Sequence, residues 1–208
     1  MILPRRSVLG FLFAAALSAV LPSAAFAQAG DPAQFVQSLG DRALQQMTGQ
    51  QLSDTELQSR FRTLLTESFD IPRIGAFTAG PQWRAATPEQ QKEFLALFEN
   101  QVVNAYAKRF KQYSGQQFKV TGQRKDGEDS LVQSQIIQPN GGPTVAVEWR
   151  VRPQGGALKI VDVTIAGISM SVTQRNEYAA VIQRNGGQFQ GLIDALKKQD
   201  LPVAGSTK

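Results

Sequence analysis

The chain has 208 residues, with 22 basic and 17 acidic side chains, and it contains neither cysteine nor histidine. The missing cysteine excludes disulfides, thiol catalysis and lipid attachment through cysteine. The missing histidine excludes a Ser-His-Asp triad and removes the commonest transition-metal ligand. No basic cluster is interleaved with aromatic residues, so we expect no nucleic-acid binding, and we expect no metal and no cofactor.

An export signal is predicted at residues 1–27. Arg5-Arg6 precedes an apolar run from Val8 to Leu21, and Ala25-Phe26-Ala27 forms a small-x-small cleavage site. The run is too short for a membrane span of roughly 20 residues, which disfavours the alternative of an uncleaved anchor helix. The arginine pair partly resembles a twin-arginine signal, and the export route stays open. We expect residues 28–208 to act as a soluble protein in the periplasm.

Helices are predicted along the first half of the chain by apolar residues at helical spacing. The first begins at Asp31-Pro32 and ends before Gly49, and the second follows a capping box at Ser53–Glu56. Pro72 interrupts the pattern, with a short helical turn around it. The longest helix begins at Thr87-Pro88 and is expected to reach Gly115.

From Gln116 onward the apolar period changes to two, which predicts strands at 118–120, 131–138, 144–152 and 157–165. Short Gly- and Pro-rich turns join them, so the sheet should be antiparallel and packed by helices on one side only. Helices return at 171–185 and 188–199. The fold class is therefore α+β, with one domain at 28–200 and a flexible tail at 201–208.

The apolar side chains of the helices must face one side of this sheet. A close-packed core is the simpler interpretation of that pattern. The alternative is that helices and sheet diverge and enclose an apolar cavity for a ligand. Periodicity alone does not separate the two. Glu148 and Asp162 fall on the opposite face of the strands, so the pattern does not support a carboxylate pair for acid–base chemistry.

A resemblance to a known family favours the cavity. The segment Ala166-Gly167-Ile168-Ser169 followed by Arg175-Asn176-Glu177-Tyr178 resembles the signature of MlaC-type proteins, the toluene-tolerance family. The start of the longest helix, Trp83–Gln90, and the tryptophan-bearing strand Val147–Val151 are also similar to that family, as is the turn Pro139-Asn140-Gly141. The resemblance extends over about residues 31–199.

The resemblance implies a fold and a function. The fold would be a cone like that of nuclear transport factor 2 or cystatin, in which helices cover the concave face of a curved sheet. The function would be that of a periplasmic phospholipid carrier, not an enzyme, that maintains outer-membrane lipid asymmetry. Its partners would be an MlaA-like outer-membrane lipoprotein complex and an inner-membrane ABC transporter with an MCE-type lipid-binding subunit. We expect the carrier itself to be a monomer.

The acyl chains would lie between the helices and the sheet. The expected helical contacts are Leu65, Phe69, Phe98, Val102 and Tyr106. The expected sheet contacts are Val147, Trp149, Val151, Val163 and Ile165, with Ile168 and Met170 at the mouth.

Three alternatives stay open at this point. The cargo could be a hopanoid or another terpenoid lipid, as in a related branch of the family. The chain could be an isomerase-type enzyme on the same fold, which would need Asp162 or Glu148 in the cavity opposite a tyrosine. It could also be an adaptor with a solid core and no ligand.

Overall fold

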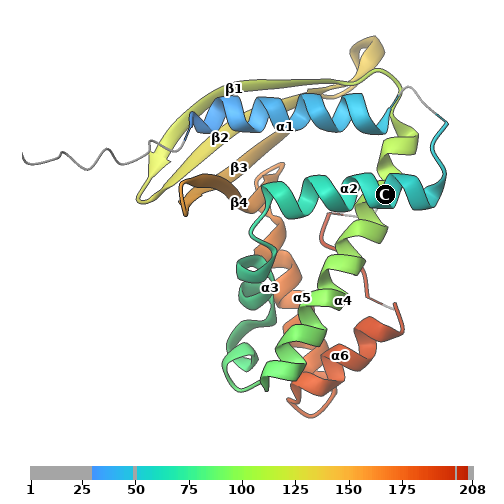
Figure 1. Ribbon diagram of the computed structural model, residues 1–208, viewed down its shortest axis with the longest axis vertical. Helices are drawn as coiled ribbons and strands as arrows, with labels where there is room; N and C mark the ends of the chain where they lie inside the picture. Colours follow the sequence, from blue (N-terminus) through green and yellow to red (C-terminus); the bar gives the residue numbers. More distant parts are fainter. Residues whose placement is uncertain (1–29, 49–50, 200, 206–208) are drawn as a thin grey trace, which may run out of the picture.

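Two layers make up the computed structural model, which describes residues 30–48, 51–199 and 201–205. The predicted export signal at 1–27 lies outside these residues. The upper layer holds the sheet with helices α1 (Pro32–Met47) and α2 (Asp54–Ser68). Helices α3 (Ile71–Ala79), α4 (Pro88–Ala107), α5 (Met170–Arg184) and α6 (Phe189–Lys197) extend below it (Figure 1).

Helix starts follow the predicted capping signals. Ser53 and Glu56 form a capping box at α2, and Thr87 and Gln90 form a second one at α4. Helix α4 ends earlier than expected, at Ala107, and the chain continues as a short 3₁₀ helix, Lys108–Gln112. A second 3₁₀ helix, Gly80–Arg84, connects α3 to α4, and a third spans Pro139–Gly141.

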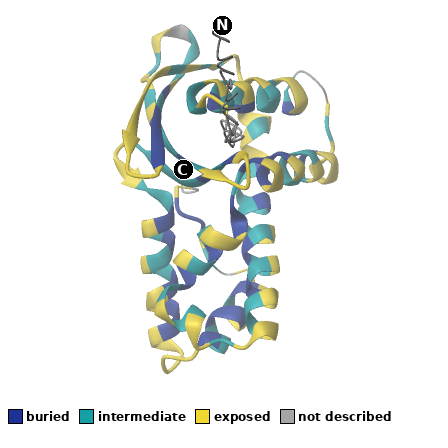
Figure 2. Ribbon diagram, turned by 60° about the vertical axis from the view of Figure 1, so that its left-hand side comes forward, coloured by how far each residue is buried: buried dark blue, intermediate teal, exposed yellow. Residues whose placement is uncertain are grey.

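The sheet is antiparallel with strand order β1-β2-β3-β4-β5, which confirms the α+β class. Its strands are β1 (Gln117–Asp126), β2 (Asp129–Ile137), β3 (Val145–Gln154), β4 (Ala157–Ile165) and the two-residue β5 (Ile168–Ser169), which the sequence pattern did not predict. Helix α1 lies along the concave face of this curved sheet (Figures 1 and 2). Contrary to the one-sided packing expected, α3 and α5 also border a groove on the outer face of the sheet.

A β-bulge interrupts the pairing of β3 with β4. Arg150 pairs with Asp162 but Val151 pairs with Ile160, so Val161 is the extra residue. Val161 and Asp162 consequently both border the groove on the outer face of the sheet, while Ile160 is fully buried among apolar side chains.

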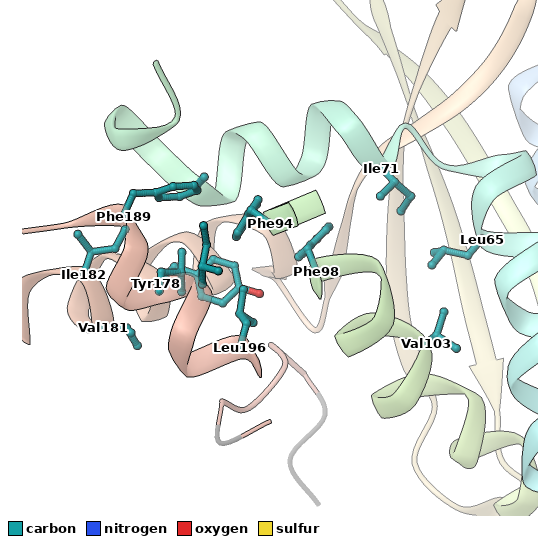
Figure 3. Packing of buried hydrophobic residues seen from close by; sticks show 13 residues of the cluster. Leu65, Ile71, Phe94, Phe98, Val103, Tyr178, Val181, Ile182, Phe189 and Leu196 are labelled. Carbon is teal, nitrogen blue, oxygen red and sulfur yellow. The ribbon is translucent and has the colours of Figure 1, made fainter. Parts of the chain in front are cut away.

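Two hydrophobic clusters stabilise the layers. The helical cluster brings Phe94, Tyr178 and Leu196 together between α4, α5 and α6 (Figure 3). The sheet cluster joins α1 and α2 to the concave face through residues such as Val132 and Val151. Phe61 and Phe69 pack against both clusters, so they mark the boundary between the layers.

A buried carboxylate stabilises the outer face of the sheet. Asp129 is 2% exposed and accepts hydrogen bonds from Arg150 at 2.9 Å and from Arg152 at 2.8 Å. These arginines, with Arg152 contributing most, hold the pKa of Asp129 below its ordinary value. The charge pairing therefore favours the folded state at neutral pH.

We expect Asp129→Asn to lower the free energy of unfolding by about 1–3 kcal/mol at pH 7, because two arginines lose their shared partner. Since the folded-state pKa lies below the unfolded value near 3.9, this contribution is present above about pH 4 and is lost as the pH falls further. Urea unfolding at pH 7 and pH 3 measures the difference. Asp126→Asn is the control, because Asp126 is exposed and has Arg150 as its one ion-pair partner among the described residues. An equal loss in both variants would contradict the prediction.

Candidate functional site

An apolar cavity of about 380 Å³ lies where the two layers meet. One wall comes from α2, α3 and α4, the opposite wall from the concave face of β2, β3 and β4, and one end from the start of α5. Apolar side chains dominate both walls. The lining residues are Phe61, Leu65, Phe69, Ile71, Ile74, Phe98, Val102, Tyr106, Arg109, Phe110, Ile136, Val147, Trp149, Asp162, Val163, Ile165, Met170, Ser171, Gln174, Val203 and Ala204.

The structure brings ten of the twelve residues expected at a ligand to this cavity. The two others lie elsewhere. Val151 is fully buried in the sheet cluster, paired with Ile160 and covered by close packing. Ile168 follows a tight turn at Ala166-Gly167, where both residues have positive φ, and its side chain is 58% exposed outside the cavity.

Trp149 lies in the sheet wall of the cavity, and its indole N–H is hydrogen-bonded within the sheet. The indole Nε1 donates a hydrogen bond to Ser134 Oγ at 2.8 Å, and that hydroxyl in turn donates to the Val147 carbonyl. Phe118 packs against the indole at a ring-centroid distance of 6.1 Å. With its N–H bonded, Trp149 offers only apolar surface to the cavity.

The helix wall carries one basic side chain at its edge. The guanidinium of exposed Arg109 lies 5.6 Å from the centre of the Tyr106 ring. The hydroxyl of Tyr106 donates a hydrogen bond to the Ala204 carbonyl. Burial raises the pKa of Tyr106 above its ordinary value, so the hydroxyl stays protonated and serves as a donor.

The C-terminal segment 201–205 forms part of the cavity wall, where a flexible tail was expected. Val203 and Ala204 are 7% and 3% exposed. Buried Gln174 accepts a hydrogen bond from the Ala204 N–H at 2.9 Å, and Gln101 donates to the Leu201 carbonyl at 2.9 Å. The apolar run Leu201-Pro202-Val203-Ala204 was the available sequence signal. Residues 206–208 lie outside the described part of the chain.

The carboxylates near the cavity are engaged in structural bonds. Asp162 accepts hydrogen bonds from Ser169 Oγ at 2.6 Å, from the Val163 N–H at 2.8 Å and from the Ser171 N–H at 3.1 Å. It thereby anchors the start of α5. Glu148 lies on the outer face, where it accepts from Gln133 at 3.0 Å and pairs with Arg124. The oxygens of both carboxylates are thus already engaged by partners within the fold.

The site is an apolar binding cavity. Over the described residues, no group of three or more acidic side chains is arranged to hold a metal ion. In the same part of the chain, no helix has both the length and the apolar character needed to cross a membrane. The lining favours a ligand with long apolar chains.

Proteins of known name or structure share this fold and sequence pattern. The chain is 27% identical over 111 residues to the toluene tolerance protein ttg2D of Pseudomonas putida, a match covering 53% of this chain and 52% of that protein. It is 22% identical over 134 residues to the intermembrane phospholipid transport system binding protein MlaC of Haemophilus influenzae, covering 62% and 63%. These matches thus span about half to three fifths of each relative.

A solved structure matches over a larger part of the chain. The phospholipid-binding protein from Ralstonia solanacearum, in complex with a phospholipid, superposes with a TM-score of 0.74 at 25% identity. The match covers 82% of this chain and 97% of that protein. The family model described as MlaC protein matches residues 37–198, most of the described chain. The chain therefore belongs to the MlaC family.

Proposed function

We propose that this protein is a periplasmic phospholipid carrier, exported through residues 1–27, that exchanges lipid with an outer-membrane lipoprotein complex and an inner-membrane ABC transporter and so maintains outer-membrane lipid asymmetry. The observation that carries the proposal is the apolar cavity between sheet and helices, in a fold whose Ralstonia neighbour binds a phospholipid. Family membership supports the same role.

A carrier solves a large energetic problem. Two long acyl chains contain about 28 methylenes, and leaving them in water costs about 0.8 kcal/mol each, roughly 22 kcal/mol in all. Free diffusion across an aqueous compartment is therefore negligible. The carrier has only to match the membrane's apolar environment, which requires apolar surface and no catalytic group. The headgroup can stay in water at the rim.

We propose that the segment 201–205 moves when the chains enter. A cavity of about 380 Å³ is at the small end of the 300–1,000 Å³ range for ligand sites, so a two-chain lipid needs a wall to yield. The helices and strands are fixed by backbone hydrogen bonds. The C-terminal segment has no regular structure and is held mainly by Gln101, Tyr106 and Gln174.

The enzyme alternative requires a free carboxylate in the cavity, and the carboxylate that borders the cavity is already hydrogen-bonded. Asp162 does border the cavity, but its oxygens are occupied in anchoring α5. The buried Tyr178 donates to Gln101, and burial raises the pKa of its hydroxyl. We propose a binding role with no catalytic step.

Native mass spectrometry of the purified mature protein should show a bound diacyl phospholipid at about one per chain. Extraction and lipid analysis identify the cargo. A bound hopanoid would instead support the terpenoid alternative. Protein that is free of lipid in every preparation, and that takes up none from phospholipid vesicles, would contradict the carrier function.

We expect Val102→Trp to reduce the co-purified lipid at least fivefold, because the indole fills space between α4 and the sheet. The matched control is Ala180→Trp, which adds the same ring at an exposed position of α5. Thermal unfolding of both variants checks that the fold is intact. Equal lipid content in the two variants would show that the acyl chains do not occupy this cavity.

We expect Gln174→Leu to loosen the C-terminal segment, because the Ala204 N–H loses its partner while the side-chain volume is nearly kept. Amide hydrogen exchange at residues 203–205 should become faster, and lipid transfer to acceptor vesicles should speed up severalfold. Gln183→Leu, an exposed change on the same helix, is the control. Unchanged exchange at 203–205 would argue against a movable wall.

A further inference from the structure

A second concavity lies on the outer face of the sheet and is not used by the carrier site. Its volume is about 1,100 Å³, and it is bordered by β2, β3 and β4 on one side and by α3, the 3₁₀ helix Gly80–Arg84 and the start of α5 on the other. We call it the arginine groove. Because side chains alternate along a strand, Glu148, Arg150 and Arg152 enter it from the face opposite to Val147 and Trp149.

The arginine groove has an excess of positive charge. Five arginines border it, Arg73, Arg84, Arg150, Arg152 and Arg175, against three carboxylates, Asp129, Glu148 and Asp162. Each carboxylate is already engaged. Asp129 pairs with two groove arginines, Glu148 pairs with Arg124, and Asp162 anchors α5. The acidic side chains of the groove are therefore not available to its other arginines.

Arg84 and Arg175 on the helical side are the available cations. Within the described residues, neither has a carboxylate at salt-bridge distance. The guanidinium of Arg175 lies 5.0 Å from the centre of the Phe77 ring, which holds it in place. Phe77 is 39% exposed and Val172 is 46% exposed, and both border the groove together with the two cations.

We propose that the arginine groove is a docking surface for an acidic, extended segment of a partner protein that carries apolar side chains between its carboxylates. Arginine binds carboxylates through paired N–H donors, and arginine, like tryptophan and tyrosine, is enriched among the residues that contribute most to binding at protein interfaces. Exposed Phe77 and Val172 would contact the apolar side chains of that segment.

The shape of the groove favours a polypeptide over a membrane surface. A flat lipid headgroup layer meets the rim of a concavity, whereas an extended chain can follow its floor along β3. The groove also adjoins the lipid cavity, because Asp162 and Ser171 border both. A segment bound there would lie against the start of α5, whose Met170 faces the cavity. This inference rests on the proposed carrier function in one respect: a carrier must dock on its partners.

Binding to a fluorescent peptide in which glutamate alternates with leucine tests the docking surface. The unmodified mature protein should bind this peptide, and Arg84→Glu/Arg175→Glu should weaken binding at least tenfold. The same variant should gain affinity for the matching lysine–leucine peptide, because its two new glutamates attract lysine side chains. The control is Lys92→Glu/Lys119→Glu, an equal change of charge at exposed positions outside the groove, which should stay within twofold of the unmodified protein.

Three results would overturn the inference. One is absence of binding to the glutamate peptide, and another is an equal loss in both charge-reversed variants. The third is arginine-dependent binding to phosphatidylglycerol vesicles with none to the peptide, which would assign the groove to a membrane surface. Lipid content measured by native mass spectrometry should be unchanged in Arg84→Glu/Arg175→Glu. A loss of docking with retained lipid thus separates this inference from the carrier function.

Discussion

Helix α4 is the structural member on which the cavity depends. Its 20 residues form a rod of about 30 Å that contributes Phe94 and Phe98 to the helical cluster and Ala107 to the sheet cluster. Because one rigid rod is packed into both clusters, the distance between the layers is fixed along its length. Val102 and Tyr106, in the C-terminal half of α4, line the cavity between the two clusters. The apolar surface there is left to contact a ligand, since close packing is achieved on either side of it.

The two faces of strand β3 border different sites. Its concave face contributes Val147 and Trp149 to the apolar cavity, and its outer face contributes Arg150 and Arg152 to the arginine groove. The period of two keeps the arginines out of the cavity, where an unpaired charge would be strongly disfavoured. The bulge at Val161 lets Asp162 reach the start of α5. Asp162 therefore separates the groove on the outer face of the sheet from the end of the cavity formed by α5.

The sequence predicted the features that depend on local chemistry. The capping box at Ser53, the helix start at Thr87 and the antiparallel hairpins follow from local spacing. Spacing also gave the faces of the residues that line the cavity, but only the family resemblance favoured a cavity over a filled core. Val151 was misplaced because alternation gives the face of a residue but not its distance along the strand from the cavity. The C-terminal segment was missed because it is held by long-range hydrogen bonds: Gln101 donates to the Leu201 carbonyl, and the Ala204 N–H donates to Gln174, so the partners are about 100 and 30 positions apart. No periodic pattern encodes such contacts.

If the proposed carrier function holds, bound lipid must also be released, and the composition limits the possible triggers for release. With no histidine in the sequence, the usual titration between pH 5 and 8 is absent. Burial moves the pKa of Tyr106 and Tyr178 further from neutrality. The hydrogen bonds that hold segment 201–205 are each worth about 1 kcal/mol, so a modest change in contacts can shift that segment between positions. For the proposed carrier we therefore favour release that is driven by contact with a partner at α5, whose Gln174 bonds segment 201–205.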